Sequence, residues 1–85
     1  MELRIAAVTI IVEDIDSAQP LNELLHRSGQ YVIGRFGLPY RERGVNIICV
    51  VVEAPQDVIN TLSGKIGKLP GVTAKTTYSN IITEV

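Results

Sequence analysis

The side chains best suited to recognising a ligand or a partner are gathered in one short stretch of this 85-residue chain, residues 34–44, which reads GRFGLPYRERG. An arginine guanidinium presents forked donors that match a carboxylate or a phosphate. A tyrosine ring beside them offers a surface for stacking. The sequence therefore predicts a site for a small anionic ligand or a protein partner, made of Arg35, Tyr40, Arg41, Arg43 and Gly44.

The same stretch also has a purely structural interpretation. Gly34 and Gly37 would weaken or bend an edge strand, and Pro39 is tolerated in such a strand because no ladder N–H is needed there. Gly44 could adopt a positive φ before the next strand. Arginines in a loop are usually solvated. At the level of the sequence both interpretations stay open.

The rest of the chain offers few residues that could bind a metal ion. His26 is the one histidine, and it lies beside the apolar stripe of a predicted helix, which favours an exposed side chain. Cys49 lies in the middle of the most apolar strand, where a thiol usually behaves as a small hydrophobe. A zinc site needs about four ligands. We therefore predict neither a metal site nor a cofactor.

Catalytic motifs are equally lacking. The acidic run EDID, residues 13–16, falls in a strand-to-helix turn, where such residues favour turn geometry and the helix dipole. The glycines at 34, 37 and 44 do not have the spacing of a dinucleotide fingerprint or a phosphate loop, and no Ser-His-Asp set is present. We predict that the chain is not an enzyme.

Two glycines in the second predicted helix need an explanation, since each costs about 1 kcal/mol relative to alanine. Gly64 and Gly67 could allow close packing against a neighbouring backbone. Alternatively they mark a helix break near Lys65 and Lys68 that exposes amides to an anion.

Composition limits the class of protein. Hydrophobic residues make up 46% of the chain and aromatic residues 5%, so the core must be built from Val, Ile, Leu and Ala. The net charge of −1 provides no field that would attract nucleic acid or an anionic membrane. No apolar run reaches the ~20 residues of a membrane span, and one cysteine cannot form an internal disulfide. We expect a cytoplasmic protein with no direct nucleic-acid or membrane partner.

The periodicity of apolar residues predicts two strand-helix-strand halves. Strands are expected at residues 3–12, 30–38, 45–53 and 72–78, and helices between Ser17 and Gly29 and from Pro55 to the Pro70-Gly71 turn. This order is the ferredoxin-like βαββαβ arrangement, an α+β fold with two helices on one face of a four-stranded antiparallel sheet. Residues 1–78 would form one domain with this fold, and residues 79–85 a tail that adds a strand or joins an interface.

The two central strands of this fold are apolar on both faces, as in VNIICVVVE at residues 45–53. Helices cover only one face of a ferredoxin-like sheet, so the other face needs a cover. The simplest cover is a second copy, and we expect a homo-oligomer, a dimer or a tetramer, through the open sheet face. The tail at residues 79–85 is an alternative cover.

Three segments carry a family resemblance: GRFGLPYRERG, the following VNIICVVVEAP, and LSGKIGKLPGV. Together they resemble the iron-only hydrogenase system regulators over roughly residues 3–77. These are short proteins with an ACT-like fold, similar also to the C-terminal domain of the nickel-responsive repressor. The resemblance implies a regulatory role in a hydrogenase system, and the ACT-like relatives imply ligand sensing at oligomer interfaces.

The sequence departs from both groups of relatives. Cys49 is the counterpart of a cysteine in the nickel-responsive domain, but the histidine ligands of that domain have no match between Tyr31 and Asn46. The turn EDIDSAQP lacks the glycine with which amino-acid-binding ACT domains approach their ligand. We therefore expect a non-catalytic sensing module for a small anionic ligand. The alternative is a structural or assembly accessory protein whose hairpin arginines dock onto a protein.

Overall fold

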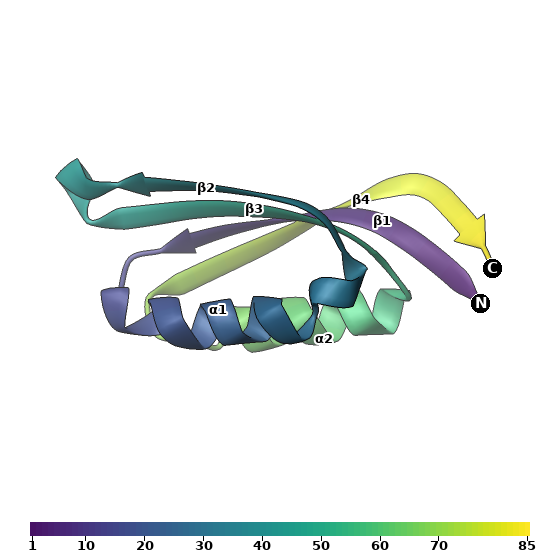
Figure 1. Ribbon diagram of the computed structural model, residues 1–85, viewed down its shortest axis with the longest axis horizontal. Helices are drawn as coiled ribbons and strands as arrows, with labels where there is room; N and C mark the ends of the chain where they lie inside the picture. Colours follow the sequence, from purple (N-terminus) through teal and green to yellow (C-terminus); the bar gives the residue numbers. More distant parts are fainter.

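The chain folds into a four-stranded antiparallel sheet with two helices on one face, as the sequence predicts (Figure 1). The computed structural model describes residues 1–85. Short 3₁₀ turns precede α1, β2 and β3. The elements are β1 (Glu2–Val12), α1 (Ala18–Arg27), β2 (Val32–Tyr40), β3 (Val45–Ala54), α2 (Gln56–Gly67) and β4 (Val72–Glu84).

The strand order β2-β3-β1-β4 confirms the ferredoxin-like topology and places β1 and β3 at the centre. Pro39 lies on an edge strand, the place in a sheet where a residue without an N–H is tolerated. The pairing of β2 with β3 shifts register between Val32 and Gly34, which makes Ile33 the extra residue of a β-bulge. This bulge decides which residues of β2 face the helices.

The core lies between the sheet and the helices. Alternate residues of the central strands point toward the helices because successive side chains of a strand point to opposite faces. Both helices turn an apolar stripe to the sheet. The fully or nearly fully buried residues from these four elements are Ala6, Val8, Ile10 and Val12; Ile48, Val50, Val52 and Ala54; Leu21 and Leu25; and Ile59, Leu62 and Ile66.

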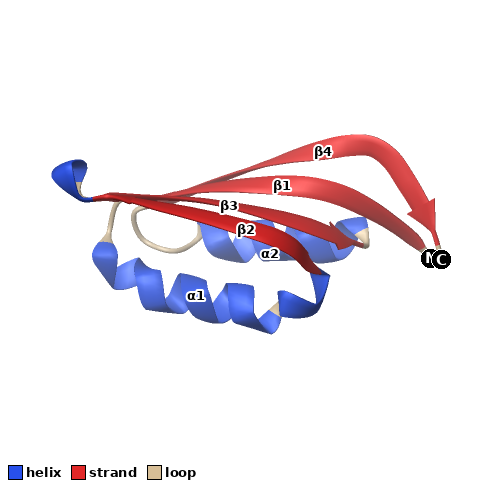
Figure 2. Cartoon of the chain, turned by 45° about the horizontal axis from the view of Figure 1, so that its top comes forward, coloured by secondary structure: helices blue, strands red, loops and turns tan.

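The opposite face of the sheet has no element over it (Figure 2). It carries the intervening residues of β1 and β3, which are apolar as well, together with the outward side chains of β2. Phe36 is 61% exposed and Leu38 48% exposed. We call this surface the open face; its apolar members are Ile5, Ala7, Ile11, Phe36, Leu38, Tyr40, Val45, Ile47, Cys49 and Val51.

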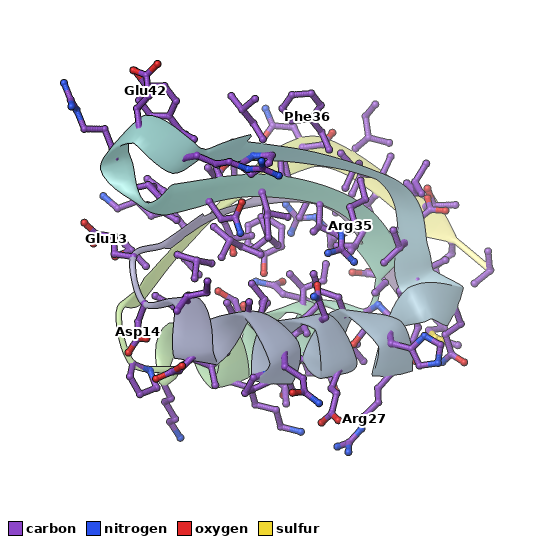
Figure 3. The ribbon with its side chains drawn as sticks, turned by 60° about the vertical axis from the view of Figure 1, so that its left-hand side comes forward. Glu13, Asp14, Arg27, Arg35, Phe36 and Glu42 are labelled. Carbon is purple, nitrogen blue, oxygen red and sulfur yellow. The ribbon has the colours of Figure 1, made fainter.

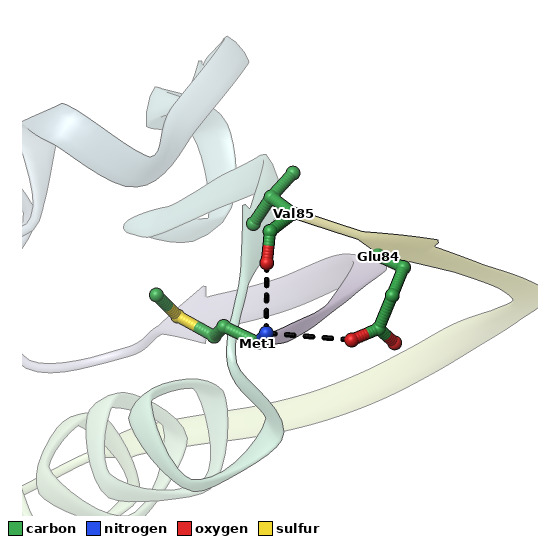
Figure 4. A network of polar contacts seen from close by, with 3 residues as sticks. All are labelled: Met1, Glu84 and Val85. Carbon is green, nitrogen blue, oxygen red and sulfur yellow. Dashed lines mark hydrogen bonds and ion pairs between the residues drawn. The ribbon is translucent and has the colours of Figure 1, made fainter.

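The last strand is longer than the sequence predicts. β4 continues to Glu84, because after an irregularity opposite Arg4 its end pairs with the start of β1. The residues expected as a tail therefore extend the sheet instead of covering the open face. The amino group of Met1 donates to the carbonyl of Val85 at 2.8 Å and lies 3.3 Å from Glu84 Oε1 (Figure 4).

Two glycines are required by backbone geometry. Gly44 has a φ of 64° in the β2–β3 turn, as expected, and Gly71 has a φ of 68° between α2 and β4. By contrast, a Cβ at Gly64 or Gly67 would meet nothing within 4 Å, and α2 runs without a break to Gly67. Neither close packing within the chain nor a helix break accounts for these two residues.

Candidate functional site

The structure divides the stretch GRFGLPYRERG among three places. Along β2, Arg35 points toward α1 while Phe36 points to the open face (Figure 3). Beyond β2, residues 41–43 form a 3₁₀ turn at the tip of the β2–β3 hairpin. The predicted site residues therefore do not form one cluster, because strand alternation and the hairpin separate them.

Arg35 is exposed and lies on the side of β2 that faces α1. Its Nη2 donates a hydrogen bond to Asn22 Oδ1 of α1 at 2.8 Å. The two residues line an open cavity of about 760 Å³ between α1 and β2, and Leu25, Val32 and Val50 contribute apolar atoms to it. We call this cavity the α1–β2 groove. It places the guanidinium of Arg35 beside apolar atoms, which suits an anionic group attached to an apolar body.

The hairpin tip forms a second candidate region. Tyr40, Arg41 and Gly44 line a cavity of about 460 Å³ together with Glu13 and Ile15 from the turn after β1. The hydroxyl of Tyr40 lies 3.4 Å from a carboxylate oxygen of Glu42 in the same turn. Arg43 is exposed and does not line this cavity. The tip thus combines a basic side chain with an acidic one.

Asn22 is the site residue that sequence reasoning missed. It lies on the exposed side of α1 in the first turns, where a polar residue is expected on any amphipathic helix. Only the crossing of β2 over α1 brings it to Arg35. No local pattern carries that information.

Cys49 and His26 lie far from any ligand set. Cys49 is half-buried on the open face, opposite Thr9 and Phe36. The apolar pattern of its strand suggested a place in the core, but Cys49 lies on the other side of the sheet. His26 is exposed on α1 and lines the α1–β2 groove. No group of three or more His, Cys, Asp or Glu side chains lies close enough together to hold a metal ion. Neither helix has the length and apolar character needed to span a membrane.

The fold and surfaces described above define a small ferredoxin-like α+β domain with an uncovered sheet face. A model of the TM1266-like family, described as "Iron-only hydrogenase system regulator, putative", matches residues 4–76. The chain belongs to this family, which confirms the resemblance seen in the sequence. No curated protein matches.

Two solved structures extend the comparison. The uncharacterized protein TM1266 from Thermotoga maritima is 36% identical to this chain, with a TM-score of 0.86 over 89% of this chain and 96% of that one. A formyltetrahydrofolate deformylase from Pseudomonas putida KT2440 is 17% identical, with a TM-score of 0.66 over 91% of this chain and 29% of that one. The second likeness concerns the fold alone.

Proposed function

We propose that this chain is a non-catalytic, homo-oligomeric regulatory module that senses a small anionic ligand in an iron-only hydrogenase system. The family description supports the regulatory context. The observation that carries the proposal is the open face, an apolar sheet surface with no cover from its own chain. The exposed Arg41 and Arg43 at the hairpin tip stay available for a protein partner.

Apolar side chains continue across three strands of the open face. Ile11, Ile47 and Leu38 are neighbours in one row across β1, β3 and β2. Such a continuous apolar surface is uncommon on a monomer and typical of an interface. An 85-residue domain also buries a smaller share of its surface than a larger domain does, so a second copy adds core that the chain alone lacks.

The size of the open face fits a second copy. Four strands about 4.8 Å apart and roughly eight residues long give a flat area on the order of 500 Å². Side-chain relief raises the accessible area above this figure, toward the ~800 Å² per partner that stable complexes bury.

The charges on the open face are also self-complementary. Glu53 is paired with Ile5 and Lys75 with Thr9 in the sheet register. The two charges therefore lie on opposite sides of β1, each two residues along the strand from Ala7. A two-fold axis passing over Ala7 can bring the Glu53 of one copy to the Lys75 of the other.

Light scattering coupled to size exclusion tests the oligomer. The wild-type mass should be a multiple of 9.3 kDa at tens of micromolar, and Ile47→Lys should reduce it to one protomer while the far-UV circular dichroism is retained. Ile15→Lys is the matched control, because Ile15 is 86% exposed and lies outside the open face. A wild-type mass of one protomer would refute the oligomer.

A thermal-shift panel tests sensing separately. Amino acids, nucleotides and divalent metal salts are added to the wild-type protein, since a ligand that binds the native state raises the midpoint of unfolding. The absence of a shift with every class would contradict ligand sensing.

A further inference from the structure

Side chains of the central strands pack against the helices, but the side chains of β2 that face the helices leave space beside them. Arg35 is paired with Val50 and Gly37 with Ile48, so both face the helices, as the two core residues do. A Cβ at Gly37 would meet nothing within 4 Å. Folding alone would favour apolar side chains at these positions, since they would bury against α1. An arginine and a glycine stand there instead: Arg35 lines the α1–β2 groove, and Gly37 lines a second cavity beside it.

The groove has the volume of a small-molecule site. Its volume of about 760 Å³ lies within the ~300–1,000 Å³ usual for such sites. A second cavity of about 230 Å³ shares Asn22 and Arg35 with it and continues toward Gly37. Arg35 therefore lines both cavities.

The charge of Arg35 is not neutralised within the chain. Its hydrogen-bond partner is the neutral amide oxygen of Asn22, and the one ion pair of the structure joins Met1 to Glu84. Glu23 and Arg27 also line the groove, one turn apart on α1, where their opposite charges offset each other. The formal charges of Glu23, Arg27 and Arg35 thus sum to one positive charge, which matches a ligand with one negative charge.

We propose that the α1–β2 groove binds a small organic monocarboxylate. The carboxylate accepts hydrogen bonds from the guanidinium of Arg35, which Asn22 orients, because an arginine fork matches the two carboxylate oxygens. The apolar body of the ligand lies on Val32, which is half-buried at the wall of the groove. This inference rests on the proposed sensing function and gives it a site and a ligand class.

The test is a titration of the ¹⁵N-labelled full chain, followed by amide chemical shifts. The probes are 3-methylbutanoate, its neutral isostere 3-methylbutanamide, and inorganic phosphate. We expect saturable shifts with 3-methylbutanoate at the amides of residues 22–29 and 32–37, and none with the other two. Absence of saturable shifts, shifts confined to the hairpin tip, or equal shifts with the amide would each overturn the inference.

Two variants complete the test. Arg35→Met keeps the length of the side chain and removes its charge, and should weaken 3-methylbutanoate binding about tenfold or more, as for loss of a charged hydrogen-bonding group. Arg43→Met, at the hairpin tip, should bind as the wild type does. Unchanged binding by Arg35→Met would refute the assignment.

The oligomeric mass is measured on the same samples, so the two proposals fail separately. A monomer that still binds 3-methylbutanoate in the groove would remove the oligomer and keep the site. An oligomer that does not bind it would remove the site alone.

Discussion

Replacement of Gly71 by alanine offers the sharpest test of how the two halves of the fold are joined. Gly71 has a φ of 68°, and a Cβ built on it would lie 2.6 Å from Asp14 Cβ and 3.0 Å from Asp14 N. The same turn is held by a hydrogen bond from Glu13 N to Gly71 O at 2.7 Å. Backbone and a Cβ cannot move aside as the end of a flexible side chain can, so the clash must distort the turn.

Gly44 provides a matched control for the magnitude. Its φ of 64° is nearly the same, but a Cβ there would meet nothing within 4 Å. Gly44→Ala should therefore lower the free energy of unfolding only by the cost of a left-handed non-glycine residue, about 1 kcal/mol. Gly71→Ala should lower the free energy of unfolding by that amount and by a further ~1–3 kcal/mol, because the added Cβ overpacks the turn. The difference between the two variants isolates the contact with Asp14.

Urea unfolding at one fixed protomer concentration measures both variants, since association would otherwise alter the apparent stability. Asp14→Gly in the Gly71→Ala background removes the clashing Cβ, and a double-mutant cycle should show a favourable coupling. The single change also removes a cap, because Asp14 Oδ1 accepts from the N–H of Asp16 at 2.9 Å. Equal losses for Gly44→Ala and Gly71→Ala, or zero coupling, would refute the reasoning.

Three further changes follow from local contacts. Gly64→Ala should stabilise the protein by about 1 kcal/mol and raise its melting temperature, because the position is interior to α2 and a Cβ there meets nothing. Ser17→Ala should cost about 1–2 kcal/mol in urea unfolding, because the hydroxyl of this buried residue donates to the carbonyl of Pro70 at 2.6 Å. Ile10→Ala should cost about 2–5 kcal/mol in the same assay, since Ile10 is fully buried, whereas Ile81→Ala, at a position 62% exposed, should cost far less.

Much of the fold is predictable because several local signals agree. Apolar residues on both faces mark β1 and β3 as central strands, and the glycines and prolines between elements mark the turns. The end of β4 was not predictable. Its continuation to Glu84 depends on pairing with Glu2 and Leu3 at the other end of the chain, and Ile81 and Ile82 are exposed although apolar.

The position of Ser17 shows a similar limit. The sequence correctly places it before α1, but its side chain makes no capping bond there and instead bonds Pro70 in the turn before β4. A serine hydroxyl at this position can either cap the helix N-terminus or bond a distant turn. Propensity alone does not distinguish them.

The candidate site was only partly predictable. The positions of Arg35, Arg41 and Arg43 differ by even numbers, which would place the three side chains on one face of a continuous strand. The strand ends at Tyr40, however, so only Arg35 faces α1. The β-bulge at Ile33 also matters, because a shift of one residue exchanges the two faces. The groove itself is lined by residues of α1, β2 and β3, and no local pattern in the sequence shows that the fold brings these residues together.

The division of GRFGLPYRERG between two faces of β2 links the two proposals. Arg35 borders the ligand groove, and Phe36, its neighbour in sequence, lies on the open face through which copies are proposed to associate. β2 is an edge strand that bonds only to β3, carries a bulge, and contains two glycines, so few contacts fix its position. Arg35 and Phe36 are adjacent residues of this strand, so a ligand that shifts the backbone at Arg35 also shifts Phe36. A ligand that changes association by shifting this strand is itself bound more or less tightly on association by the same factor, because a coupling free energy between two sites is reciprocal.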